Sequence, residues 1–157
     1  MDRVVPHFQE ELEALQSRLL ERGRLAEERV RACIEALESR DLNLVGQVMA
    51  GDEPINQLHI EIDNRCFRLL ALYQPMATAL RAIVSAVKIN TDLERVGDLA
   101  VNIAEAAQRH GSHPPVKKLI DIPTMGTIAQ TMLRDALDAY VRRDTALAHA
   151  VLNADDQ

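Results

Sequence analysis

A run of apolar residues between Ala82 and Ala107 constrains the fold of this chain more than any other feature. Its members are separated by alternating steps of four and three residues: Ala82, Ala86, Ile89, Leu93, Val96, Ala100, Ile103 and Ala107. This heptad spacing puts the side chains on one side of an α-helix, where they form a packing seam. Small alanines in the seam let a neighbouring helix approach closely. The pattern predicts a long helix over about 76–110 within a helical bundle.

Two earlier stretches have the same helical period. One predicts a helix from about His7 to Ser39, in which Gly23 interrupts the apolar stripe and could mark a bend. The other predicts a helix from about Leu42 to Tyr73. Pro54 removes a hydrogen-bond donor there, so we expect a kink, or a restart of the helix capped by Asp52.

The C-terminal part of the chain adds a helix over roughly Thr124–Arg142 and the start of another near Asp144. Composition agrees, because hydrophobic residues make up 47% of the chain and aromatic residues only 3%. Alanine and leucine dominate the apolar set, and they favour helices over sheets. Long helices with short connections predict an all-α fold built as an antiparallel bundle.

An internal repeat relates the two ends of the chain. Residues 25–53 align with 128–156 at an offset of 103 residues without a gap, and the turn Arg40-Asp41 recurs as Arg143-Asp144. We interpret the match as a duplicated unit. The fold class predicted is therefore an antiparallel three-helix bundle followed by a partial second repeat.

The repeat also predicts how the chain is divided. We expect a first three-helix repeat over 1–110, a linker over 111–123 and a truncated start of the second repeat over 124–157. A complete second copy would bring the chain to about 213 residues by the same offset. The last helices would then lack part of their partners, and would cover another surface or pack against a second copy of the chain.

Charge and hydropathy restrict the class of protein. The formal net charge is −6 and the pI about 5.3, which argues against binding to nucleic acid or to an anionic membrane surface. No run of 18 apolar residues occurs, and the N-terminus has no apolar signal segment, so the cytoplasm is the expected location. Cys33 and Cys66 fall on apolar stripes and are expected to be small, reduced core residues.

One face of the helix predicted over 76–110 changes from apolar to acidic along its length. After Val87 it continues with Asn90, Thr91, Glu94, Asp98, Asn102 and Glu105. Glu94 and Asp98 are one helical turn apart, so both carboxylates can face one cation. Oxygen ligands suit Mg²⁺, Ca²⁺, Mn²⁺ or iron. The alternative is a solvated helix face that a nearby cation such as Arg95 balances.

Enzymatic motifs are absent from the sequence. It contains no phosphate-binding glycine-rich loop, no HExxH motif and no nucleophile elbow, and its histidines are scattered. The absence of Glu-x-x-His argues against a ferritin-like di-iron centre. We therefore expect a protein that is not an enzyme.

Two stretches carry a resemblance to a known family. They are QPMATALRAIV over 74–84 and KINTDLERVGDLAVNIAE over 88–105, and they closely resemble the PhoU family of phosphate-specific transport system accessory proteins. The FQEEL segment that starts at Phe8 and the Arg40-Asp41 turn also match this family's first helix pair. The similarity covers nearly the whole chain, and its DLERxGD core is specific.

The resemblance implies a function in phosphate homeostasis. Members of the family repress phosphate uptake and the phosphate-starvation response, and link the phosphate ABC transporter, through its ATPase, to a sensor histidine kinase. By resemblance we expect these two partners, a homodimer, no nucleic acid, and contact with the membrane only through the partners. The family is built of two three-helix repeats, and this chain departs from it by lacking the rest of the second.

The resemblance also implies a metal site. Several members carry metal at a Glu/Asp-x-x-x-Asp motif, which here is Glu94 to Asp98, with Asn102 as a neighbour and Glu28 as a looser candidate. The cofactor expected is a divalent or iron ion, and no direct binding of phosphate is expected. Two alternatives stay open: a metal-binding protein whose ion is its function, and a helical scaffold without either role.

Overall fold

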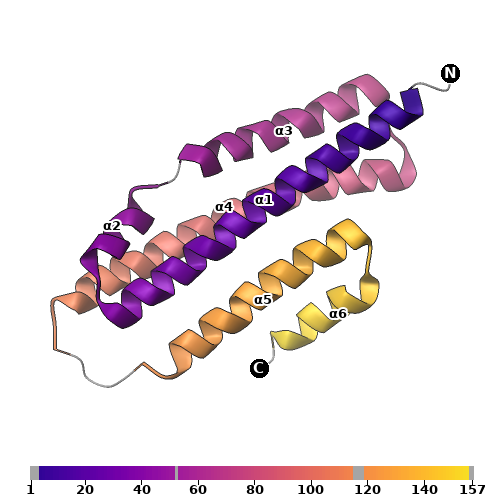
Figure 1. The fold of residues 1–157 in the computed structure, drawn as a ribbon. Helices are drawn as coiled ribbons and strands as arrows, with labels where there is room; N and C mark the ends of the chain where they lie inside the picture. Colours follow the sequence, from indigo (N-terminus) through magenta and orange to yellow (C-terminus); the bar gives the residue numbers. More distant parts are fainter. Residues whose placement is uncertain (1–3, 52, 115–118, 156–157) are drawn as a thin grey trace. The chain divides into compact units, whose positions relative to one another are not determined.

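The computed structural model describes residues 4–51, 53–114 and 119–155, and all regular structure in these ranges is helical (Figure 1). In chain order the helices are α1 (Val4–Ser39), α2 (Leu42–Met49), α3 (Glu53–Tyr73), α4 (Ala77–Gly111), α5 (Asp121–Arg142) and α6 (Thr145–Ala154). This is the predicted fold class, a three-helix bundle followed by the start of a second repeat. Within the described ranges, no helix combines the length and the apolar character that a membrane crossing requires.

The helix boundaries refine the prediction at two places. The helix expected over 42–73 is two helices, α2 and α3, separated at Gly51, whose φ is +79°. Asp52, the expected cap of the restart, lies outside the described residues. Helix α5 starts at Asp121 and not at Thr124. Pro123 is accommodated in its first turn, where the backbone N–H groups have no partner within the helix.

The chain divides into two compact units. The first unit comprises residues 1–22 and 52–94, and thus the beginning of α1, all of α3 and the first half of α4. Leucines of α1 and apolar residues of α3 and α4 fill its core: Leu12, Leu15, Leu19, Leu58, Ile62, Cys66, Leu69, Ile83, Ala86 and Leu93. The rings of Phe8 and Tyr73 meet edge to face with centroids 5.2 Å apart, which fixes α1 against the end of α3.

The second unit comprises residues 23–51 and 95–157. One cluster of its core joins α1, α2 and α4 and consists of Cys33, Ala36, Val45, Val48, Ala100, Ala104 and Ala107. All the contributions of α4 to this cluster are alanines, and two of them, Ala100 and Ala107, were predicted as members of its seam. Both cysteines of the chain are free and buried, as expected.

The arginine of the duplicated turn has the same backbone conformation in both copies, and an aspartate caps the next helix in each. Arg40 and Arg143 adopt left-handed conformations with φ of 59° and 56°. The aspartate that follows each arginine caps the next helix: the Asp41 side chain accepts from the backbone N–H of Asn43, and that of Asp144 accepts from Leu147. A turn of this kind closes one helix and supplies an acceptor for one of the free backbone N–H groups at the start of the next. The sequence repeat is therefore also a structural repeat.

Helices α1 and α5 meet through a reciprocal pair of close contacts within the second unit. A Cβ atom at Gly23 would lie 2.0 Å from Leu137 Cδ1, and one at Gly126 would lie 3.0 Å from Ile34 Cγ1. The repeat offset of 103 residues converts Gly23 into Gly126 and Ile34 into Leu137. The two contacts are therefore equivalents across the two copies. Gly23 is explained by this close approach, since α1 continues through it.

Candidate polar site on helix α4

A buried arginine organises the polar residues of the first unit. Arg22 of α1 is only 1% exposed. Its Nη1 donates to the backbone oxygen and to the side-chain Oδ1 of Asn90 on α4, and its Nη2 donates to the carboxylate of Glu94 one turn later. A guanidinium is a planar fork of donors, so one side chain can hold two residues of a facing helix.

Asn90 joins this arginine to the third helix of the unit. Its Nδ2 donates to the backbone oxygen of His59 over 3.0 Å and to Oδ1 of Asp63 over 2.8 Å. Asn90 is fully buried, whereas the sequence placed it on the same polar face as Glu94. With acceptors and donors all engaged, Asn90 is a polar crosslink inside the bundle.

His59 lies between the two carboxylates of the site. Its Nε2 is 3.6 Å from Asp63 Oδ2, and its Nδ1 is 3.7 Å from Glu94 Oε2. Both distances allow ion pairing by a protonated imidazole but are too long for hydrogen bonds. Two buried nitrogens, His59 Nδ1 and Arg22 Nε, have no hydrogen-bond partner among the described residues.

The chain itself supplies a positive charge to the site. Burial lowers the pKa of Arg22, while the neighbouring carboxylate of Glu94, and more weakly that of Asp63, oppose this effect. A guanidinium stays protonated at any physiological pH. Arg22 therefore supplies a permanent positive charge beside Glu94, at the residue that the sequence selected as a cation ligand.

The predicted metal ligands fall into different surroundings. Glu94 belongs to the polar site of the first unit, while Asp98 and Asn102 are exposed residues of the second unit, one and two turns further along α4. Glu28, the looser candidate, pairs with Arg24. In the described part of the chain, no three residues among His, Cys, Asp and Glu are arranged to hold a metal ion. A cation at Glu94 would have to share the carboxylate with the guanidinium of Arg22, whose positive charge opposes it.

Three residues of this site were missed from the sequence: Arg22, His59 and Asp63. A signal for Arg22 was present, because it continues the apolar stripe of α1 at a step of three from Leu19 and of four to Ala26. A charged residue at a core position needs a buried partner. His59 and Asp63 gave no comparable signal, since they border the core of α3 and are partly exposed.

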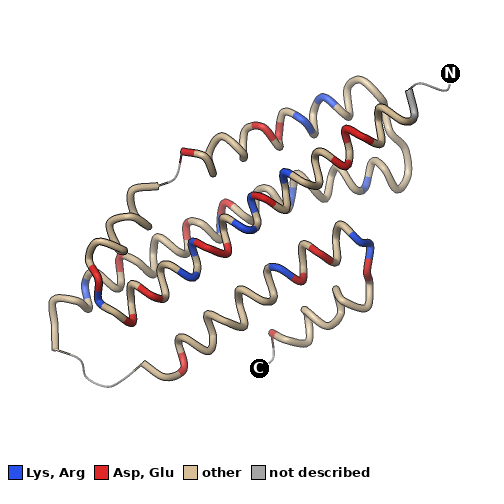
Figure 2. The backbone as a smooth tube through the Cα atoms, in the orientation of Figure 1, with Lys and Arg blue, Asp and Glu red and all other residues tan. Residues whose placement is uncertain are grey.

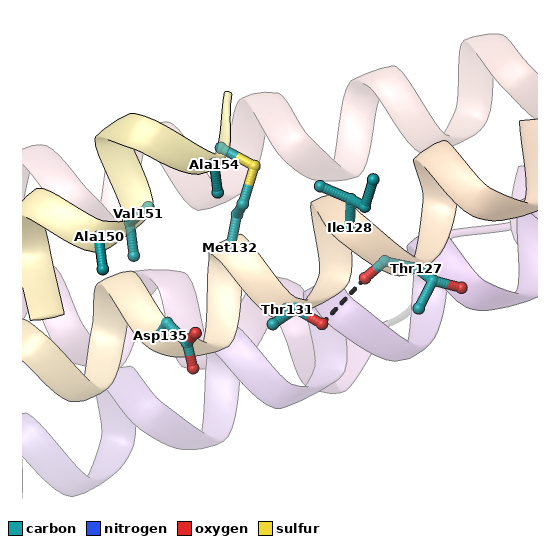
Figure 3. Close-up of a pocket in the computed structure, with 8 residues that line it drawn as sticks. All are labelled: Thr127, Ile128, Thr131, Met132, Asp135, Ala150, Val151 and Ala154. Carbon is teal, nitrogen blue, oxygen red and sulfur yellow. Dashed lines mark hydrogen bonds between the residues drawn. The ribbon is translucent and has the colours of Figure 1, made fainter. Parts of the chain in front are cut away.

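A groove in the second unit lies between α5 and α6 (Figure 3). It has a volume of about 200 Å³ and is lined by Thr127, Ile128, Thr131, Met132, Asp135, Ala150, Val151 and Ala154. Thr131 Oγ1 donates to the backbone oxygen of Thr127 over 3.0 Å, so its hydroxyl is satisfied inside α5. Asp135 is the one charged residue of the lining. An anion such as phosphate would find no cation in this groove.

Comparisons with known proteins agree on one family. The family model described as the PhoU domain matches residues 19–107 and 122–157. A relative from Aquifex aeolicus, a "Phosphate-specific transport system accessory protein PhoU homolog", is 38% identical over 93% of this chain and 66% of its own length. A homologue of the same name from Clostridium acetobutylicum is 41% identical over 95% of this chain and 68% of its own length.

Solved structures give the same result. The crystal structure of PhoU from Pseudomonas aeruginosa superposes with a TM-score of 0.87 at 38% identity, covering 95% of this chain and 72% of that one. The phosphate transport system regulatory protein PhoU from Streptococcus pneumoniae superposes with a TM-score of 0.85 at 30% identity, covering 96% and 70%. The chain spans about two thirds of the length of the curated relatives described here.

Proposed function

Since this chain belongs to the PhoU family, we propose that it is a negative regulator of phosphate uptake and of the phosphate-starvation response. The observation that carries the proposal is the name shared by relatives about 40% identical over nearly the whole chain, which are accessory proteins of the phosphate-specific transport system. The protein acts by binding and not as an enzyme, and it works in the cytoplasm.

The mechanism proposed is that of a helical adaptor. Its partners are the ATPase of the phosphate ABC transporter and the cytoplasmic part of a sensor histidine kinase, so that it meets the membrane only through them. It functions as a homodimer and does not bind nucleic acid. A long helical surface supports this role, because helices fixed by polar crosslinks such as Arg22–Asn90 present side chains at constant spacing.

The proposed organisation follows the repeat. The first three-helix repeat occupies 1–110, a linker occupies 111–123 and the beginning of the second repeat occupies 124–157, with the first turn of α5 reaching back from Thr124 to Asp121. The two stretches matched by the family model, 19–107 and 122–157, support this division. So do the equivalent turns at Arg40-Asp41 and Arg143-Asp144.

A metal-binding protein is the second candidate function. Glu94 and Asp98 lie one turn apart on α4 with Asn102 a turn beyond, which is the arrangement that would present oxygen ligands to a divalent or iron ion. The pairing of Glu94 with Arg22 weighs against it. Metal content measured for the wild type and for a Glu94→Gln, Asp98→Asn variant separates the two functions. Loss of bound metal without loss of phosphate regulation favours the second candidate.

A phosphate-regulated alkaline phosphatase reporter tests the regulator directly. The host lacks its own regulator, and it receives either this chain or one extended to a complete second repeat. Repression in high phosphate by this chain supports the proposal and shows that the first repeat suffices. Repression by the extended chain alone assigns the activity to the complete protein. Failure of both chains contradicts the regulator and favours the metal-binding protein.

A further inference from the structure

A stretch of the first unit has a charge opposite to that of the whole chain. Residues 64–91, which form the end of α3, the corner after it and the beginning of α4, contain no aspartate or glutamate. They contain four basic residues, Arg65, Arg68, Arg81 and Lys88, in a chain of net charge −6. Figure 2 shows acidic residues along the rest of α3 and α4 on either side of this segment.

Exposed apolar side chains gather in the same stretch. Among the described residues twelve large hydrophobic side chains are classed as exposed, and five of them lie here: Phe67, Leu72, Met76, Leu80 and Val84. Met76, at the corner between the helices, is 81% exposed. Because isolated exposed apolar residues are ordinary but concentrated ones mark interaction sites, this concentration requires an explanation.

On α4 the apolar and basic residues share one face. Leu80 and Val84 are one turn apart, and Arg81 and Lys88 are two turns apart. At 100° per residue the four side chains fall within a sector of about 100°. The apolar pair therefore has a basic border along one side. No carboxylate of the described residues pairs with Arg81 or Lys88, whereas Arg65 on α3 is paired with Glu11 and Glu61.

The end of α3 extends this face. The bonds of Asn90 to His59 and Asp63 set the register of α3 against α4. Phe67 follows Asp63 by one turn, so it stands on the same flank of α3, and the register brings it to the level of Ala86 and Val87. Phe67 is 60% exposed. Phe67, Met76, Leu80, Val84, Arg81 and Lys88 form what we call the hairpin face.

We propose that the hairpin face docks an amphipathic α-helix of another protein, whose apolar stripe is bordered by aspartate and glutamate. A seam between two helices accepts a third helix by ridge-and-groove packing, with the apolar anchors in the seam. Arg81 and Lys88, which pair with no carboxylate of the described residues, select carboxylates on the incoming helix. The proposal deepens the adaptor role and rests on it in one respect, that the partner is a protein.

An anionic membrane is a weaker fit to the same residues. Two basic side chains give little attraction to a bilayer, because each contributes about 1 kcal/mol near an anionic surface. The helix α1 of the same unit carries Glu10, Glu13 and Glu21, which such a surface repels. A carboxylate-bearing helix satisfies both the charge and the apolar stripe without bringing α1 near a negative surface.

Binding of a designed helical peptide tests the proposal. The probe has leucines at helical positions i, i+3, i+4 and i+7 with glutamates along both borders, and its matched partner has lysines in place of the glutamates. Fluorescence anisotropy with the full chain should show binding of the glutamate peptide, weaker at high salt, and about tenfold weaker binding of the lysine peptide. Equal binding of the two peptides, or no binding, overturns the proposal.

Substitutions in the chain show where the glutamate peptide binds. Val84→Glu should weaken the glutamate peptide about tenfold, and Lys88→Glu, a surface change that leaves the core intact, should act in the same direction. Leu99→Glu is the matched control, since Leu99 is an exposed leucine of α4 outside the acid-free stretch, and it should bind as the wild type does. Peptide binding that survives both Val84→Glu and Lys88→Glu contradicts the assignment.

Two further measurements test whether the hairpin face binds a membrane or a second copy of the chain instead. Vesicles of phosphatidylcholine and phosphatidylglycerol that bind the wild type and not Lys88→Glu, without selective peptide binding, overturn the proposal in favour of a membrane. A dimer that Val84→Glu dissociates in sedimentation, without peptide binding, overturns it in favour of a second copy. Peptide binding together with a failed phosphate reporter supports the docking surface and contradicts the proposed regulatory function. A working reporter without peptide binding supports the regulatory function and contradicts the docking surface.

Discussion

The two copies of the internal repeat share a turn but differ in what packs against it. In the first copy Val48 of α2 is buried in one cluster with Ala100, Ala104 and Ala107 of α4. In the second copy its equivalent, Val151 of α6, lines the open groove between α5 and α6. Related local sequences thus give a closed helix pair where a seam of small residues covers it, and an open pair where none of the described residues does. The local sequence pattern determines the turn and the two helices that it joins. Packing against a third helix buries their apolar residues and forms the core.

A second difference concerns one position three residues before the aligned segments. Arg22 in the first copy corresponds to Met125 in the second by the offset of 103 residues. Arg22 is buried and bonded to Asn90 and Glu94, whereas Met125 is exposed. The polar residue is inside and the apolar residue outside, which reverses the usual order. The position therefore tests whether the buried polar site stabilises the fold.

Replacing Arg22 should have the largest effect. Arg22→Met leaves Asn90 and Glu94 without their donor, and the free energy of unfolding should fall by about 3 kcal/mol, the low end for a broken buried pair because Glu94 is partly exposed. Met125→Arg, the reverse change at the equivalent position, should be nearly neutral. Urea unfolding of both variants measures the difference. Equal stabilities would show that the polar site does not support the fold.

Shortening the equivalent valines should have the next largest effect. Val48→Ala leaves a cavity under the alanines of α4 and should cost about 2 kcal/mol. Val151→Ala removes methyl groups from the wall of an open groove and should cost less than about 1 kcal/mol. Thermal unfolding of the two variants measures the two losses of stability. If Val151→Ala is as costly as Val48→Ala, the second copy is closed in solution.

Alanine substitutions at the two equivalent glycines should differ in stability by a smaller amount. Gly23→Ala forces Leu137 to move, because the new Cβ would lie 2.0 Å from its Cδ1. The resulting strain exceeds the gain in helix propensity, for a net loss of about 1 kcal/mol. A Cβ atom at Gly126 would lie 3.0 Å from its nearest neighbour, so the strain and the gain in helix propensity nearly cancel there. A Gly23→Ala variant that is as stable as Gly126→Ala would show that α1 and α5 are not closely packed.

The two buried thiols should make the stability of the chain fall at alkaline pH. Burial raises the pKa of the Cys33 and Cys66 thiols from 9.0 to about 11. The unfolded thiols therefore ionise first, and stability that is full below pH 9 is lost as the pH rises towards 11. Each thiol should account for about 1 kcal/mol at pH 10.

Urea unfolding near neutral pH and at about pH 10 measures this loss. A Cys33→Ala, Cys66→Ala variant serves as the control, since it keeps the charged residues and removes both thiols. Its stability should change less between the two pH values than that of the wild type. An equal change in both proteins would assign the pH dependence to other groups.

The helices were predictable because their apolar residues recur at helical spacing over many turns. The break between α2 and α3 was visible in Gly51 and Pro54, and the repeat in the Arg40-Asp41 turn. The start of α5 was missed by three residues, since Pro123 was assigned to the linker although the first turn of a helix tolerates proline. Boundaries depend on such single residues more than helix identity does.

The candidate site was only partly predictable. Glu94 was selected from its spacing to Asp98, but its partner Arg22 lies 72 residues earlier and joins it only through tertiary packing. Asn90 was placed on a polar face and is buried, because a helical wheel gives the direction of a side chain but not what covers it. Whether Glu94, Asp98 and Asn102 hold a metal ion stays a prediction.

The most direct test of the central claim, that this protein is an adaptor, is the assembly of a ternary complex. The purified chain is mixed with the ATPase of the phosphate ABC transporter and the cytoplasmic part of the sensor histidine kinase, and size-exclusion chromatography with light scattering measures the masses formed. The adaptor account predicts one species that contains all three proteins, and no complex of ATPase and kinase without the chain. A chain that binds neither partner, or whose binding to one excludes the other, would contradict it.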